Sequence, residues 1–186
     1  MVSHTSFGLL LSFICCLLAP RLSYSEDLRL QSLSMRARLS EKTILGEDAS
    51  EDFEEYDVSA NFELPWKRNF TSGWGMGTRL MASAGTLRGA GETALVVSLI
   101  PELILESEDG WVTLDLGAGG ALFSRHRFGS QDFGRSFQFA LTLGVGVPLY
   151  KNLWLGYRFL HYSDAGVHGS DTTGADFHMI EFSYRL

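Results

Sequence analysis

The chain has 186 residues, of which 45% are hydrophobic and 20% are charged, and its formal net charge is −7 at pH 7. This acidic balance argues against a nucleic-acid-binding protein, because such a protein needs a basic surface to neutralise phosphates. The length is sufficient for one domain.

Residues 1–25 have the features of a secretory signal peptide. A short apolar core runs from Phe7 to Ala19, and Ser23-Tyr24-Ser25 provides a small-residue cleavage site. The segment also contains Cys15 and Cys16, so the mature domain, residues 26–186, has no cysteine. A lipid-modified cysteine is the alternative, although no small residue directly precedes either one. We therefore expect export across a membrane and a fold without disulfides.

Removal of the signal peptide takes away Arg21 and no acidic residue. The mature chain then carries 14 basic and 22 acidic residues, a net charge of −8. No later apolar run is long enough for a transmembrane helix, since the most continuous one, residues 93–105, is interrupted by a proline and a glutamate. Such a chain is either a soluble β-domain or an outer-membrane β-barrel.

The mature chain alternates apolar and polar residues with the period of two that is typical of β-strands. Eight strands are expected, around residues 32–39, 56–64, 74–84, 95–105, 112–117, 137–149, 153–163 and 177–186. One face of each is apolar, and the other carries mainly small or charged residues. The pattern predicts an all-β, eight-stranded antiparallel transmembrane β-barrel.

The connections support this fold. Residues 107–110 and 150–152 make short turns, whereas residues 41–52, 124–136 and 164–176 make longer loops, as in transmembrane barrels. The connection between the second and third strands is longer than this scheme expects. Aromatic residues near strand ends are placed for interfacial belts: Tyr56, Trp74, Trp111, Tyr150, Trp154, Tyr157 and Tyr184.

Alternation alone does not distinguish the inside of a barrel from its outside. A secreted lipocalin-type barrel, with its apolar face inward, is therefore the alternative fold. The absence of disulfides, the small polar face and the aromatic Tyr184 near the end of the last strand favour the membrane barrel.

His161 and Ser163 extend the apolar face of one predicted strand, where polar side chains facing lipid are costly unless they have a function. A serine becomes a nucleophile when a histidine takes its proton and a carboxylate orients that histidine. Counting back along the last strand puts Asp176 on the same face and rim, whereas Glu181 points inward. We predict a triad of Ser163 as nucleophile, His161 as general base and Asp176. Polar residues at a barrel rim without catalytic function are the alternative.

Backbone N–H groups directly after a nucleophile can stabilise the oxyanion, so we expect Asp164 and Gly166 to supply them. No metal site is predicted, because His126, His168 and His178 lack the spacing of zinc ligands. No cofactor is implied.

The sequence His161-Tyr162-Ser163-Asp164-Ala165-Gly166, followed by Gly174-Ala175-Asp176 and the final strand, resembles the C-terminal signature of the lipid A 3-O-deacylase family. The resemblance covers residues 161–186. It implies an outer-membrane serine esterase whose Ser-His-acid triad faces lipid and removes the 3-O-linked hydroxyacyl chain from lipid A of lipopolysaccharide. It also implies location in a bacterial outer membrane.

Three residues near the predicted site depart from this signature. Asp164 replaces the usual Asn, and Thr172-Thr173 replace Asn-Pro. A carboxylate beside an oxyanion hole opposes the negative charge that develops there. A non-catalytic outer-membrane barrel is the alternative function, and the acyl length and the formation of a homodimer are left open.

Overall fold

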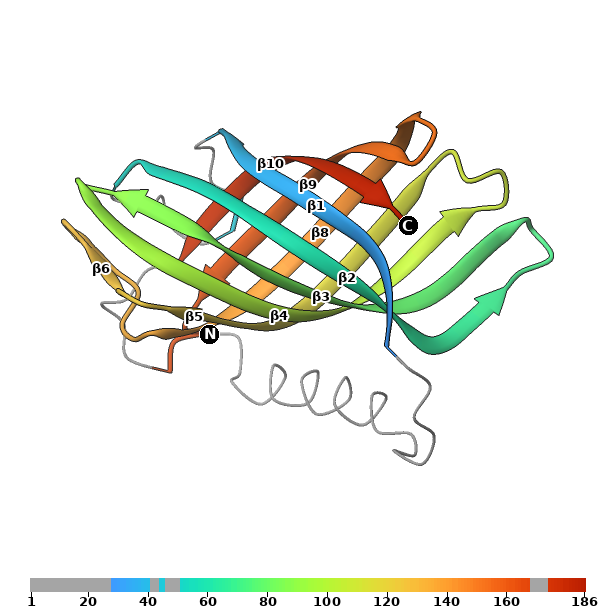
Figure 1. Ribbon diagram of the computed structural model, residues 1–186. Coiled ribbons are helices and arrows are strands. Elements are labelled where there is room, and N and C mark those ends of the chain that lie inside the picture. The colour runs from blue at the N-terminus through green and yellow to red at the C-terminus, as the bar shows by residue number, and fades with distance from the viewer. Residues whose placement is uncertain (1–27, 41–43, 46–50, 168–173) are drawn as a thin grey trace.

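The chain forms a closed barrel of eight strands in which every neighbouring pair is antiparallel (Figure 1). The computed structural model describes residues 28–40, 44–45, 51–167 and 174–186, so the predicted signal peptide lies outside the described residues. The strand order is β1-β10-β9-β8-β5-β4-β3-β2, and the first and last strands pair to close the barrel. The predicted fold is confirmed. No helix in the described part of the chain is long and apolar enough to cross a membrane.

Each barrel strand overlaps an alternating segment of the sequence, although β2, β3 and β5 end five or six residues beyond the predicted segments. They are β1 (Arg29–Ser40), β2 (Phe53–Asn69), β3 (Trp74–Gly89), β4 (Glu92–Ser107), β5 (Thr113–Phe123), β8 (Phe137–Tyr150), β9 (Leu153–Ser163) and β10 (Ala175–Arg185). Two very short strands, β6 (Arg127–Phe128) and β7 (Gln131–Asp132), pair as a hairpin within the long loop predicted after the fifth barrel strand.

The apolar faces of the strands point out of the barrel. In β4, the side chains of Leu95, Val97 and Leu99 are exposed, whereas the intervening Val96 and Ser98 are buried. Polar and charged side chains fill much of the interior, including Glu181, as predicted. An apolar exterior around a polar interior is the arrangement of a transmembrane barrel and the reverse of a lipocalin-type barrel.

The second and third strands are joined by a tighter turn than the sequence predicts. β2 continues through Pro65 to Asn69, and the turn closes with a hydrogen bond of 2.8 Å from the Phe70 N–H to the Trp74 carbonyl. The pairing of β2 with β3 shifts register between Glu63 and Lys67. Such an irregularity accommodates proline, which has no N–H to donate to a neighbouring strand.

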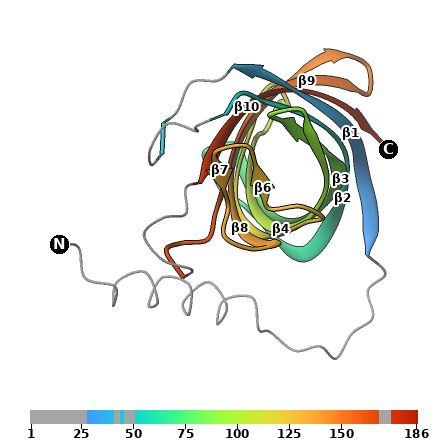
Figure 2. The same ribbon diagram turned by 90° about the vertical axis from the view of Figure 1, so that its left-hand side faces the viewer.

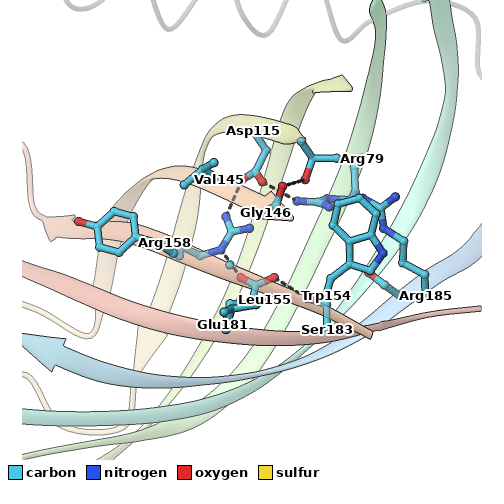
Figure 3. Close-up of a pocket in the computed structure, with 14 residues that line it drawn as sticks. Arg79, Asp115, Val145, Gly146, Trp154, Leu155, Arg158, Glu181, Ser183 and Arg185 are labelled. Carbon is cyan, nitrogen blue, oxygen red and sulfur yellow. Dashed lines mark hydrogen bonds and ion pairs between the residues drawn. The ribbon is translucent and has the colours of Figure 1, made fainter. Parts of the chain in front are cut away.

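A network of ion pairs fills the middle of the barrel (Figure 3). Arg158 donates to Glu181, Glu102 and Asp115 at 2.6, 2.9 and 2.8 Å, and Arg79 also pairs with Glu102 at 2.6 Å. The cavity bordered by Arg79, Asp115, Arg158 and Glu181 has a volume of about 30 Å³, which is room for only one or two water molecules. The interior is therefore filled by side chains rather than open as a channel.

One of the aromatic residues assigned to the interfacial belts lies inside the barrel. Trp154 is buried, and the Arg185 guanidinium lies 3.3 Å from the centre of its ring (Figure 3). The belt assignment of Trp154 is wrong, because its parity on β9 is opposite to that of Leu153 and Leu155. A cation stacked on an indole face is attracted to the ring, so this contact helps to hold Trp154 inside the barrel.

Aromatic side chains close the barrel at the end with the long loops. Phe133 of the β6–β7 segment packs against Phe53 and Phe123, with ring centres 5.8 and 5.2 Å apart. Figure 2 shows the β6–β7 hairpin lying across the mouth of the barrel. This aromatic plug continues to Tyr162 and Phe177, so it lies directly beneath the strand ends that carry the predicted triad.

Candidate active site

Strands β9 and β10 bring the predicted triad together at one rim of the barrel. His161 on β9 lies directly opposite Asp176 on β10, and Ser163 lies opposite Phe139 on β8. Side chains two apart in a strand point to the same side, so His161 and Ser163 share the outer face. The structure therefore places all three predicted residues on the lipid-facing side, next to the longer loops.

His161 and Asp176 form a short hydrogen bond. The imidazole Nδ1 lies 2.6 Å from the Asp176 Oδ1, and the side chains are 15% and 1% exposed. With the ionised carboxylate as acceptor, Nδ1 carries the proton and Nε2 is left to accept one. This is the tautomer that a general base for serine requires.

Gly174 lies close to both His161 and Ser163. A Cβ atom at Gly174 would lie 3.0 Å from His161 Cε1 and 3.2 Å from Ser163 Cβ. It would also lie 2.7 Å from the carbonyl oxygen of Tyr162. The histidine ring and the serine side chain thus border the same small volume, and a glycine keeps that volume open.

The turn after Ser163 contains the two predicted oxyanion donors. Ala165 and Gly166 both have positive φ, 54° and 74°. The Gly166 N–H donates to Asp164 Oδ1 at 2.8 Å, and the Val167 N–H donates to the Asp164 carbonyl at 3.1 Å. The Gly166 N–H is therefore engaged by the carboxylate at the position that departs from the family signature.

Two backbone groups that the sequence does not reveal complete the surroundings of Asp176. The N–H groups of Ile44 and Leu45 donate to Asp176 Oδ2 at 2.5 and 2.6 Å. They belong to the loop between β1 and β2, which is distant in sequence. Backbone donors of this kind have no sequence signature, since any residue except proline supplies an N–H.

Tyr162 supports the same strand end from inside the barrel. Its hydroxyl donates to Glu55 at 3.1 Å, and its ring packs edge-on against Phe123 at 5.1 Å. The side chain is fully buried. Because Tyr162 lies between His161 and Ser163, its packing fixes the backbone that carries them.

The remaining histidines have other surroundings. His178 is buried beside Phe159 and hydrogen-bonds to the hydroxyl of Tyr157, and His126 lies 3.2 Å from Asp132. His168 and Thr172-Thr173 lie outside the described residues. Within the described residues, no cluster of three or more His, Cys, Asp or Glu side chains is arranged to hold a metal ion.

Comparisons with known proteins place this geometry in context. The family described as lipid A 3-O-deacylase (PagL) matches residues 54–185, which is more than half of the chain and includes the whole predicted triad. Lipid A deacylase PagL of Bordetella bronchiseptica is 27% identical over 136 residues, covering 69% of this chain and 75% of that protein. Lipid A deacylase PagL of Pseudomonas aeruginosa is 33% identical over 81 residues, covering 42% and 46%.

A solved structure has the same fold. The crystal structure of the outer membrane enzyme PagL superimposes with a TM-score of 0.67 at 19% sequence identity, covering 83% of this chain and 99% of that chain. At this level of identity, the likeness establishes the barrel architecture.

Proposed function

The chain belongs to the lipid A 3-O-deacylase family, and we propose that it acts as a serine esterase in which Ser163, His161 and Asp176 form the catalytic triad. It is a hydrolase of the bacterial outer membrane, and its substrate is lipid A. The main support for this triad is the 2.6 Å hydrogen bond between His161 and Asp176 on the outer face. Ser163 follows two residues later on that face, and an acyl ester of a lipid lies on the same side of the barrel wall.

The first half of the reaction forms an acyl-enzyme. Ser163 Oγ attacks the carbonyl carbon of the 3-O-acyl ester while its proton passes to His161 Nε2. The bond between that carbon and the sugar oxygen then breaks. His161 gives the proton to the departing sugar oxygen, and Asp176 stabilises the imidazolium meanwhile.

The second half releases the acyl chain. Water gives a proton to His161 Nε2 and attacks the acyl carbonyl, the bond to Ser163 Oγ breaks, and the proton returns to the serine. The products are a free hydroxy fatty acid and lipid A with a free 3-hydroxyl group.

The oxyanion would be held by backbone N–H groups of the turn after the nucleophile. The N–H of Asp164 is the first of these, and the N–H of Gly166 becomes a second donor when the Asp164 carboxylate releases it. The neighbouring carboxylate makes this hole weaker than one lined by Asn.

Lipid A has access to this site from the membrane itself. The triad lies at the rim with the longer loops, which in outer-membrane barrels is the extracellular side, and lipopolysaccharide occupies the outer leaflet there. The exterior below the rim exposes apolar side chains such as Leu141 and Leu143, which would contact the acyl chains of the bilayer. Substrate can therefore reach Ser163 by lateral diffusion.

Mass spectrometry of lipid A tests this function directly. Cells that make the wild type should lose one hydroxyacyl chain from lipid A, and cells that make Ser163→Ala should not. Heat-modifiable migration on gels shows that both proteins are folded barrels. Unchanged lipid A in the presence of folded wild type would instead support a non-catalytic barrel.

We also propose that residues 1–25 are removed on export. Their apolar core and small-residue end support this cleavage. The intact mass of protein purified from outer membranes should correspond to residues 26–186, whereas the mass of the whole chain would contradict the proposal.

A further inference from the structure

The carboxylate of Asp176 is almost fully buried although it lies on the outer face of the barrel. Its side chain is 1% exposed. A buried charge is tolerated only when hydrogen bonds satisfy it. His161 Nδ1 hydrogen-bonds to Oδ1 at 2.6 Å. The second oxygen, Oδ2, needs hydrogen-bond donors from elsewhere.

The loop between β1 and β2 supplies donors to that second oxygen. The N–H groups of Ile44 and Leu45 converge on Oδ2 at 2.5 and 2.6 Å, from positions 132 and 131 residues away in sequence. The side chains of Ile44 and Leu45 remain 60% and 37% exposed. The backbone N–H groups of these two residues, and not their apolar side chains, therefore make the contact with Asp176.

We propose that the backbone N–H groups of Ile44 and Leu45 are positioning groups for catalysis. By holding Oδ2, they fix the rotation of the carboxylate so that Oδ1 faces His161 Nδ1. The inference rests on the proposed function, because it assigns a role through Asp176. It makes the backbone of Ile44 and Leu45 part of the active site through their contact with Asp176.

Proline removes an N–H and alanine keeps it, so a matched pair of variants isolates this contact. We expect Leu45→Pro to react about tenfold more slowly than Leu45→Ala, the loss expected for a hydrogen bond to a charged group. Ile44→Pro against Ile44→Ala tests the other donor independently. All variants are compared as folded barrels, identified by heat-modifiable migration.

The reaction is followed with a fluorophosphonate in detergent and with lipid A in vesicles. With the probe, the Ser163 Oγ–P bond forms, the P–F bond breaks, fluoride leaves and the serine proton passes to His161. Labelling reports the state of the triad without a need for lipid A binding. For lipid A, the proline variants should lower kcat and leave KM unchanged relative to their alanine partners.

A double-mutant cycle separates positioning from general damage by proline. In the Asp176→Ala background, the N–H groups have no carboxylate to hold, so the tenfold ratio between Leu45→Pro and Leu45→Ala should disappear. A ratio that persists there, or its absence in the original background, would overturn the proposal. A different result would contradict the proposed function, namely equal rates of labelling for the wild type and Ser163→Ala.

Discussion

At the residue scale, the site depends on a position that has no side chain. Gly174 faces the space bordered by His161 and Ser163, and its carbonyl accepts a bond of 3.4 Å from the buried Gln131. The Tyr162 carbonyl oxygen, 2.7 Å from the point that a Cβ atom at Gly174 would occupy, belongs to the backbone and has little freedom to move. The geometry of the proposed triad therefore depends partly on Gly174 having no Cβ atom.

Gly174→Ala should lower kcat by about 100-fold, since a displacement of about 1 Å between reacting groups costs this much. The added methyl group would push His161 away from Ser163. Rates of lipid A deacylation measure the effect. Gly77→Ala is the control, because the nearest atom to an added Cβ at Gly77 is the Trp66 carbonyl oxygen at 3.7 Å, an ordinary contact, and Gly77 does not have a positive φ. Equal rates for Gly174→Ala and wild type would contradict this role of the glycine.

Asp164→Asn should raise kcat by about threefold to tenfold. The amide oxygen can still accept the Gly166 N–H, and the substitution removes a negative charge from beside the developing oxyanion. The relevant measurement is kcat for lipid A, with KM recorded in parallel. A fall in kcat would mean that the carboxylate is needed for the turn more than it opposes the oxyanion.

Parity along two strands was sufficient to predict which polar side chains share the outer face at this rim. His161, Ser163 and Asp176 could be placed on one face because a β-strand alternates strictly and because both strands end at the same rim. The backbone donors from Ile44 and Leu45 could not be predicted in this way. Their position depends on the path of a loop, which periodicity does not define.

At the element scale, the sequence predicted strands with a continuous apolar face well and short or irregular strands poorly. β8 and β9 were predicted almost to the residue, because their apolar faces are continuous. The hairpin of β6 and β7 was missed, since two residues are too few to show alternation. The extension of β2 was missed as well, because Pro65 reads as the end of a strand unless a local register shift accommodates it.

The ion pairs between strands provide a test of the interior. Arg158→Leu leaves three buried carboxylates without their shared cation, which should lower the free energy of unfolding by about 3–5 kcal/mol. Arg158→Lys keeps the positive charge and should lower the free energy of unfolding by less. Urea unfolding in detergent micelles, followed by tryptophan fluorescence, gives both values. An unchanged unfolding midpoint for Arg158→Leu would show that the network adds no stability.

At the scale of the whole molecule, the interior of the barrel is filled in two different ways. The aromatic plug closes the end that carries the triad, and the ion-pair network fills the middle. A filled interior leaves the outer wall as the surface on which a lipid can bind. The proposed catalytic groups accordingly lie outside the barrel, in contrast to enzymes that bind substrate in an internal cleft.

This orientation predicts a dependence on depth for charges placed on the outer wall. Leu143, near the middle of β8, and Tyr150, at its end, are 53% and 63% exposed. Leu143→Arg should destabilise the barrel in lipid vesicles by about 2–4 kcal/mol, whereas Tyr150→Arg should cost no more than about 1 kcal/mol. Reversible unfolding by urea in vesicles measures the two differences. Equal and small effects would mean that water surrounds the whole wall, which a barrel that deacylates lipid A within the bilayer does not allow.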